Sequence, residues 1–459
     1  MKKRVVAFAF ILAALVALAL AGCGNTQASS SAAASGSSEA ASASAESASA
    51  QAESASASGQ AASSDAAEST VPQLEFNGVP KASFQPVNNF NEPGEMTDAE
   101  VEKADRAIRA YEPKQESLLI NKAKSFFYHD QLASSTKSLY DGLMSLLEDP
   151  TTNEHVVAVT LASAADQKQL ADDFYLAMFA IQYDHPEFFW MYNGIETEIV
   201  AKVNPTGDKV YFFLEKPYKN YEKEMKAFNE AVDKFLADID MNAPDNEKAL
   251  AIHDKLCALV SYDDDVAAKA GKGSDLAHTA YGVFVANGSG DAHKAVCDGY
   301  SLAYEYLLQQ VGIEATVMVG EGGTKDNSGP HAWSLVKLDG DWYEVDSTWD
   351  DAMTDWNDAL DKAKKEDPNN EALPYYEKAL NDKKYYDIIT HYQYNLTTKQ
   401  FSDYTPPEEC TYKFDDAELT IPQPCSHKRA CDLQGYEYYD TLTKLAPEAT
   451  GTKYAYSAK

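Results

Sequence analysis

The chain has 459 residues, and its 72 acidic side chains outnumber 39 basic ones to give a formal net charge of −33. This balance argues against nucleic acid or an anionic lipid surface as a partner, because both carry negative charge themselves. Neither a phosphate-cradling glycine loop nor a basic aromatic patch is visible, and we expect no cofactor. The length predicts two or three domains of about 100–200 residues each.

The amino terminus has the parts of a bacterial lipoprotein signal. Met1 to Arg4 is basic, Val5 to Leu20 is apolar, and Leu20-Ala-Gly-Cys23 matches the box at which bacterial lipoproteins are cleaved and acylated. The apolar run is short for a membrane-spanning helix, which needs about 20 apolar residues. We therefore expect a signal peptide over residues 1–22, a lipid on Cys23 and an extracytoplasmic protein anchored to the bacterial membrane.

Residues 23–72 are nearly all serine and alanine and contain no aromatic side chain. Such a composition cannot bury enough apolar surface to offset the entropy that is lost on ordering. We predict a disordered tether here. An alanine-rich helix is the lesser alternative, because serine is dense and glycine is scattered through the segment.

A mainly helical accessory domain is predicted over residues 73–240. Thr97-Asp-Ala-Glu100 is a capping box that opens an amphipathic helix. Apolar periodicity predicts further helices over 132–147, 166–181 and 218–239. A β-hairpin is predicted from strand-like runs on either side of Pro205-Thr-Gly207, at 195–203 and 209–214.

Helices precede strands in residues 241–402, which predicts an α+β domain whose cysteine-bearing helix packs on an antiparallel sheet. The expected helices are 246–260 and one that begins at Cys297, and the expected strands are 314–319, 331–338, 341–345 and 392–396. Leu373, Tyr375, Tyr376 and Leu380 have helical spacing in a charged insertion, 351–387, where we expect a helical segment. Residues 403–459 are expected to form a C-terminal, cysteine-containing extension.

Cys297 stands at the predicted start of a helix. Apolar and aromatic residues follow it with helical spacing at Tyr300, Ala303, Tyr304, Leu307, Leu308 and Val311, and Gly312 suits the helix end. A thiol attacks a carbonyl as the thiolate, which a helix N-terminus and an imidazolium both favour. The sequence therefore indicates a nucleophile at Cys297, with its own backbone N–H as one donor to an oxyanion.

His331 and Asp346 are predicted to meet across a second hairpin. Asp339-Gly340 predicts a two-residue type I′ turn, which places Leu338 opposite Asp341. His331 and Asp346 then share one face of the sheet as diagonal neighbours, with Cβ atoms roughly 7–8 Å apart. The predicted roles are base and general acid for His331 and orientation of its ring for Asp346.

Each of the three residues has a structural alternative. A single cysteine is most often a small buried hydrophobic residue, a histidine beside Trp333 can be a hydrogen-bonded core residue, and Asp346 can cap a turn. The catalytic interpretation is favoured because the three occur together, in order, on a helix start and two paired strands. Trp333, Trp342 and Trp349 are expected in the core or in the wall of a cleft.

Three motifs resemble those of the bacterial transglutaminase-like superfamily, whose fold is papain-like. They are Cys297-Asp-Gly-Tyr300, His331-Ala-Trp333 and Trp342-Tyr-Glu-Val-Asp346 continued by Ser-Thr-Trp-Asp350. Upstream segments at 252–263 and 278–283 are also similar to the lead-in of these proteins, and 392–397 resembles their closing strand. The resemblance covers roughly residues 245–400 and implies a Cys297, His331, Asp346 triad.

The sequence contains four cysteines besides Cys23 and Cys297. Cys257 lies among apolar residues of a predicted helix and is expected to be a buried free thiol. Cys410, Cys425 and Cys431 favour at least one disulfide, in keeping with an exported protein. A zinc set that also includes His427 is disfavoured, because the spacing matches no common zinc finger. We expect no metal.

These features predict a thiol enzyme that acts on peptide or amide bonds of an envelope peptide or protein through an acyl-enzyme. A protease or amidase is slightly favoured over amine transfer, because no acceptor site can be read. Two alternatives remain: a non-catalytic surface binding module with the same fold, and a cross-linking or adhesive lipoprotein.

Overall fold

The computed structural model describes residues 90–112, 118–163, 167–191, 198–268, 276–286, 293–324, 327–351, 360–403, 408–415, 417–420 and 425–458. The predicted signal peptide, the predicted lipidation site at Cys23 and the predicted tether lie outside the described residues. Among the residues that are described, no helix is both long and apolar enough to cross a membrane.

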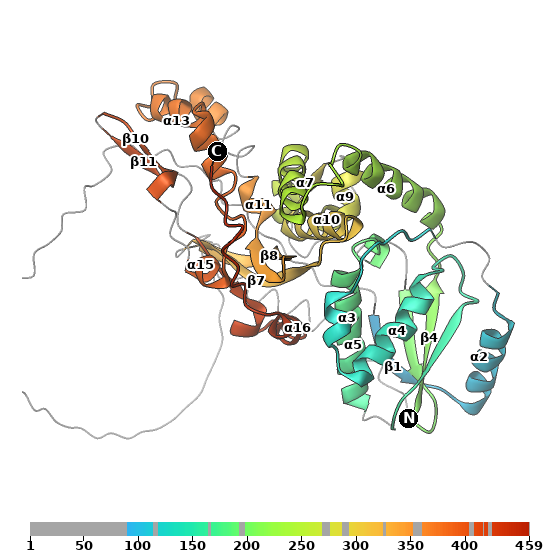
Figure 1. Ribbon diagram of the computed structural model, residues 1–459. Helices are drawn as coiled ribbons and strands as arrows, with labels where there is room; N and C mark the ends of the chain where they lie inside the picture. The colour runs from blue at the N-terminus through green and yellow to red at the C-terminus, as the bar shows by residue number, and fades with distance from the viewer. Residues whose placement is uncertain are drawn as a thin grey trace, which may run out of the picture. The chain divides into compact units, whose positions relative to one another are not determined.

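The first part of the described chain combines helices with a sheet, drawn in blue to green in Figure 1. Helix α2 (Asp98–Ala110) starts after the Thr97 and Glu100 capping box, as predicted. Three more predicted helices are confirmed: α4 (Ser134–Leu147), α5 (Gln167–Asp184) and α6 (Tyr221–Leu236). The short helix α3 (Phe127–Gln131) and the 3-10 turn η1 (Phe189–Met191) were not expected.

A four-stranded sheet accompanies these helices. The predicted hairpin is present as β3 (Glu198–Val203) and β4 (Lys209–Lys216), which pair antiparallel. Strand β1 (Phe90–Glu95) joins β3 in parallel, and β2 (Val156–Thr160) joins β4 antiparallel, so the order is β1-β3-β4-β2. These two strands were not predicted: β1 contains Pro93 and Gly94, and β2 is short.

Helix α10 (Cys297–Gln310) lies on the second large sheet. All of its residues are buried. The sheet has the order β12-β7-β8-β9, with β7 at Ala315–Thr324, β8 at Asn327–Leu338, β9 at Asp341–Val345 and β12 at Ser426–Arg429. Before it come α7 (Asp245–Leu259), β5 (Ser261–Tyr262), α8 (Asp264–Ala268), η2 (Leu276–His278), α9 (Ala280–Phe284) and β6 (Lys294–Ala295). The expected α+β arrangement is confirmed.

The remaining elements follow β9. They are α11 (Ser347–Asp350), α13 (Leu373–Leu380), α14 (Lys383–Ile389), α15 (Thr398–Ser402), η3 (Glu408–Cys410), β10 (Thr411–Lys413), β11 (Glu418–Thr420), η4 (Ala430–Asp432) and α16 (Tyr439–Leu445). Helices α13 and α14 confirm the helical insertion.

The hairpin between β8 and β9 has the predicted register. Asp339 and Gly340 both adopt positive φ, 51° and 93°, as a type I′ turn requires. Leu338 pairs with Asp341, and Ser334 pairs with Val345 at the far end of the ladder. The even-length loop therefore keeps His331 and Asp346 on the same face of the sheet.

The predicted strand at 392–396 is wrong. Only an isolated bridge joins Leu396 to Glu344. Asn395 has φ 57°, which interrupts an extended strand, and the backbone N–H of Gln393 donates to the side chain of Asp350 instead of to a neighbouring strand. The fourth strand of the sheet is β12, from the predicted C-terminal extension, and it pairs with β7.

Contacts join the residues of the predicted accessory domain to the second large sheet. The Tyr128 hydroxyl donates to the carbonyl of Val317 on β7, at 2.8 Å, and Gln309 Nε2 of α10 donates to the carbonyl of Asp184 at 3.1 Å. One hydrophobic cluster of buried residues extends through both regions. The domain boundaries at 240 and 402 stay predictions.

The disulfide expected near the C-terminus is absent. The five cysteines that the structure describes, Cys257, Cys297, Cys410, Cys425 and Cys431, are free thiols. Cys410 and Cys425 lie in an apolar cluster with Trp349 and Tyr392, and Cys425 Sγ accepts a hydrogen bond from Gln393 Nε2 at 3.2 Å.

Substitution of a glycine tests the pairing of β12 with β7. A Cβ on Gly320 would lie 1.9 Å from the carbonyl oxygen of Lys428, whereas a Cβ on Gly329 meets nothing within 4 Å. We expect Gly320→Ala to lower the free energy of unfolding by about 1–3 kcal/mol, because the backbone of β12 has to move. Gly329→Ala should change it by less than about 0.5 kcal/mol. Equal urea midpoints for the two variants would contradict this pairing.

Candidate active site

Cys297 is the first residue of α10, following Val296 in extended conformation. Its side chain is 0% exposed. Burial raises the pKa of the Cys297 thiol well above its ordinary value, and the negative charge of Asp298 adds to this, while a hydrogen bond from the backbone of Ala332 acts in the opposite direction. The resting group is therefore a neutral thiol, and the helix N-terminus alone does not make it a thiolate.

His331 and Asp346 form the contact that the hairpin register predicted. His331 Nε2 lies 2.6 Å from Asp346 Oδ2, and both side chains are 0% exposed. A carboxylate only accepts, so Nε2 carries the hydrogen and Nδ1 has the lone pair. Nδ1 is buried and has no hydrogen-bond partner in the part of the chain that the structure describes. The ring is thus in the tautomer that can accept a proton at Nδ1.

Backbone packing brings Cys297 to the same place. Helix α10 packs against β8, and the backbone hydrogen bond to the Cys297 thiol comes from Ala332, the residue after His331. The structure therefore gathers the three predicted site residues, with His331 and Asp346 in direct contact and the sulfur beside the strand that carries His331.

Asp346 has four hydrogen-bond donors. Its Oδ1 accepts from the backbone N–H groups of Thr348, at 3.0 Å, and Trp349, at 3.2 Å, which makes it the N-cap of α11. Its Oδ2 accepts from His331 and from His427. Burial alone would raise the pKa of Asp346, but its interactions with His331, and to a lesser extent with His427, hold that pKa well below its usual range. Asp346 is therefore ionised.

His427 is a site residue that the sequence did not identify. It lies on β12 opposite Gly322, and its Nε2 is 2.9 Å from Asp346 Oδ2. The ring stacks on Phe401, with centroids 3.8 Å apart. Burial lowers the pKa of His427 to about 4 in spite of the hydrogen bond to Asp346. His427 is therefore a neutral donor at ordinary pH.

His427 lies on a strand far along the chain from the three motifs, so the spacing of the motifs did not indicate it.

Two further residues pack against the His331 ring. Trp349 stacks on His331, with centroids 4.8 Å apart and planes inclined by 19°. Gly322 allows the close approach of β7, because a Cβ there would lie 2.8 Å from the His331 ring. Trp333 and Trp349 are core residues, as expected, at 1% and 2% exposed.

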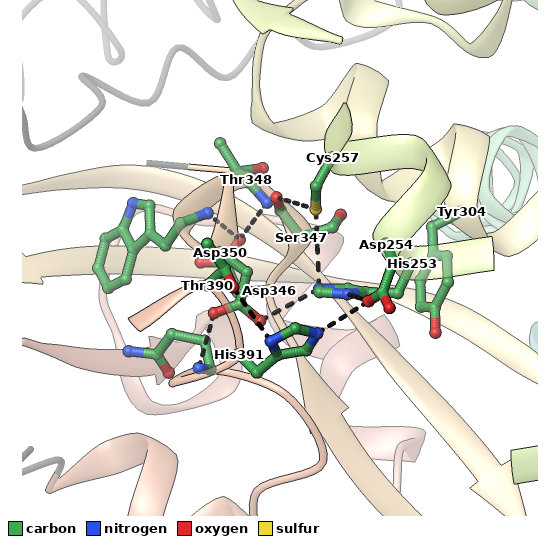
Figure 2. Close-up of polar contacts among 12 residues, drawn as sticks. His253, Asp254, Cys257, Tyr304, Asp346, Ser347, Thr348, Asp350, Thr390 and His391 are labelled. Carbon is green, nitrogen blue, oxygen red and sulfur yellow. Dashed lines mark hydrogen bonds and ion pairs between the residues drawn. The ribbon is translucent and has the colours of Figure 1, made fainter. Parts of the chain in front are cut away.

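From Asp346, helix α11 leads to a second group of polar side chains (Figure 2). Asp350, at its end, accepts from His253 Nε2 at 3.1 Å and from the backbone of Gln393 at 2.8 Å. Cys257 donates its S–H to the carbonyl of Ser347 at 3.3 Å. Burial raises the pKa of Cys257 to about 11, so it stays a thiol, in agreement with the free thiol predicted here.

The low pKa of His427 predicts a loss of stability in mild acid. Its pKa is about 4 when folded and about 6.5 when unfolded, so the unfolded chain binds more protons between these values. This one group should lower the free energy of unfolding by about 2 kcal/mol between about pH 7 and pH 5.

Urea unfolding of His427→Gln should show a smaller loss over this range, because glutamine keeps a donor without a titrating ring. His129→Gln is the control, since His129 lies at the surface. Identical pH slopes for wild type and His427→Gln would contradict the buried, neutral state of His427.

Part of the chain is similar to known proteins. Residues 233–347 match the family model of the Transglutaminase-like superfamily. A search of curated proteins found no match. A solved structure, "Crystal structure of a TGase", is 18% identical with a TM-score of 0.22, and the alignment covers 34% of this chain and 52% of that one.

A "Putative Cysteine Protease" from Cytophaga hutchinsonii is 14% identical with a TM-score of 0.20, over 33% of this chain and 62% of that one. The chain thus spans less than two thirds of the length of both structures. The family match contains Cys297, His331 and Asp346. The chain carries a domain of the transglutaminase-like superfamily, whose members are usually cysteine-dependent enzymes, and the resemblance of its motifs is confirmed.

Proposed function

We propose that this protein is a thiol enzyme that cleaves or transfers amide bonds through an acyl-enzyme on Cys297. The observation that carries the proposal is the buried hydrogen bond from His331 Nε2 to Asp346. It assigns the remaining lone pair to Nδ1, in a site that also holds a thiol. A base, its orienting carboxylate and a nucleophile are the groups that acyl transfer needs.

In the proposed reaction, the Cys297 S–H proton moves to His331 Nδ1 as the sulfur bonds to the carbonyl carbon of an amide. The tetrahedral intermediate then expels the amine, which leaves with the proton from His331. Water or a second amine attacks the thioester, His331 accepts a proton from it, and the thiolate departs and is protonated again. Asp346 remains ionised and stabilises the imidazolium throughout.

The first turn of α10 supplies the proposed oxyanion site. The N-terminal amides of a helix have no carbonyl acceptor within the helix. Cys297 is the first residue of α10, so its backbone N–H belongs to this set and lies next to the reacting sulfur. We propose that it stabilises the oxyanion, as expected from the sequence.

The neutral resting thiol makes proton transfer to His331 an essential step. Cys297 and His331 are both 0% exposed, so a substrate reaches them only after part of the surrounding structure moves. We favour hydrolysis of a peptide or amide over amine transfer, and the substrate is proposed to be an envelope peptide or protein.

A surface binding module is the rival function, and the full burial of the thiol favours it. If the protein is only a binder, it should release no amine from peptide amides with or without the sulfur of Cys297. Catalysis and binding therefore predict different effects of Cys297→Ala on turnover.

We expect the wild type to release amine from peptide amides and Cys297→Ala to lose this turnover by a factor of about 10⁴ or more, because no nucleophile remains. Profiling a panel of peptide and primary amine substrates by mass spectrometry would separate hydrolysed from cross-linked products. Cys257→Ala is the matched control, since Cys257 is a half-buried thiol whose pKa is also raised. Equal turnover by wild type and Cys297→Ala would rule out the nucleophile.

We further propose that a lipid on Cys23 holds the enzyme outside the bacterial membrane. The basic start, the apolar run and Leu20-Ala-Gly-Cys23 support this location. The serine- and alanine-rich residues 23–72 would separate the enzyme from the bilayer.

Cys23→Ser should abolish the incorporation of labelled fatty acid and shift the protein from the membrane fraction when expressed in a bacterium. Cys431→Ser is a suitable control, because Cys431 is a half-buried thiol of the folded part. Undiminished labelling of Cys23→Ser would contradict the anchor.

A further inference from the structure

A group of imidazole and carboxylate side chains lies between α7 and the residues after α14, beside α11 (Figure 2). His253 Nδ1 is 3.1 Å from Asp254 Oδ1, and His391 Nε2 is 2.8 Å from the same oxygen. One atom from each residue lies within 4.8 Å of the other two. We call His253, Asp254 and His391 the second histidine cluster.

The hydrogen bonds of His391 leave its Nε2 as the ring atom that can bind a cation. Its Nδ1 is 2.8 Å from the carbonyl oxygen of Asp387, which only accepts, so Nδ1 carries a hydrogen. Its Nε2 lies on the other side of the ring, 2.8 Å from the Asp254 carboxylate. A cation at this place would have a nitrogen and an oxygen ligand from these two residues.

His253 contacts a carboxyl group with each of its ring nitrogens. Its Nδ1 lies 3.1 Å from Asp254 Oδ1 and its Nε2 lies 3.1 Å from Asp350 Oδ2. A divalent cation between His253, Asp254 and His391 would be bound by one nitrogen of each ring and by the carboxylate.

The surroundings of both rings are those of metal-binding histidines. Such histidines donate the ring N–H that faces away from the metal to a backbone carbonyl or a carboxylate, which fixes the tautomer. His391 does so to the Asp387 carbonyl, and His253 can do so to Asp350. Two imidazoles and one carboxylate suit Zn²⁺, whereas Mg²⁺ and Ca²⁺ prefer oxygen ligands throughout.

The exposure of the second histidine cluster and the distances between its atoms also suit a metal ion. The side chain of Asp254 is 49% exposed, while those of His253 and His391 are 1% and 9% exposed, so the cluster opens to solvent on the Asp254 side. Tetrahedral bonds of about 2.0–2.1 Å place ligand atoms roughly 3.3 Å apart, slightly more than the contacts present. A small outward rotation of Asp254 admits an ion. Tyr456 stacks on His391, with centroids 3.9 Å apart, and holds that ring in place.

We propose that His253 Nδ1, Asp254 and His391 Nε2 bind one Zn²⁺, with water completing its coordination. The ion would join α7 to a segment 137 residues later in the chain. It would also fix His253 against Asp350, at the end of the helix that Asp346 caps. The proposal does not depend on the enzymatic activity.

The test is a zinc measurement on the full-length chain, stripped with a chelator and dialysed against a small excess of ZnCl₂. We expect one equivalent of bound zinc by elemental analysis, and a higher melting temperature than the stripped protein, because the ion binds the folded state. Asp254→Asn and His391→Gln should each lose most of this zinc and the rise in melting temperature. Asp254 is half exposed, so Asp254→Asn leaves the core intact.

Two control variants locate the ion. His129→Gln alters a surface histidine that also lies between two carboxylates, and His427→Gln alters the His331, Asp346 and His427 group. Both should retain the zinc. Absence of bound zinc in the wild type, or equal zinc in wild type and His391→Gln, would overturn the proposal. Loss of zinc only in His427→Gln would do the same, since it would place the ion at the triad.

Cobalt substitution gives a readout that needs no variant. With nitrogen and oxygen ligands from the cluster, bound Co²⁺ should show no sulfur-to-metal charge-transfer absorption. Such an absorption would show that a cysteine, and therefore a different site, holds the metal.

Discussion

The carboxylate of Asp346 is the group on which the site depends. Four donors from three segments meet on its two oxygens: His331 from β8, His427 from β12, and the first amides of α11. A carboxylate that is buried without such donors would become protonated, and each donor keeps it ionised. The same charge therefore orients the proposed base, starts a helix and holds the C-terminal strand against the sheet. Loss of any one donor raises the pKa of Asp346, and all four hydrogen bonds depend on the ionised carboxylate.

The burial of the site has a chemical consequence. A thiol at 0% exposure with an elevated pKa is unreactive at rest, and this contrasts with cysteines that are permanently ionised by their surroundings. Activation would come from His331, whose Nδ1 has no competing hydrogen bond among the described residues. An enzyme of this kind is protected from oxidation and alkylation until its site opens.

How far the sequence predicts this structure depends on the range of the interactions. The start of α10 at Cys297 follows from local periodicity, and the meeting of His331 with Asp346 follows from a turn only two residues long. Both are short-range constraints, and both are confirmed. The capping box at Thr97 belongs to the same class.

The errors concern contacts between distant segments. His427 reaches Asp346 across 81 positions of the chain, on a strand whose four residues show no pattern of their own. Residues 392–396 have strand-like composition, but tertiary hydrogen bonds and the positive φ of Asn395 override it. The disulfide expected among the C-terminal cysteines failed for a similar reason, because the composition of an exported protein says nothing of which side chains meet.

The central claim is that His331, held by Asp346, activates Cys297. The most direct measurement is the rate at which iodoacetamide labels each cysteine across pH, read by peptide mass spectrometry in wild type and His331→Ala. We predict that Cys297, which is unreactive while the site is closed, is labelled as the site opens, and that this labelling is faster at neutral pH in the wild type than in His331→Ala, where the reaction moves to more alkaline pH. The rate for Cys257 should be the same in both proteins. A labelling rate of Cys297 that is unchanged in His331→Ala would contradict the account.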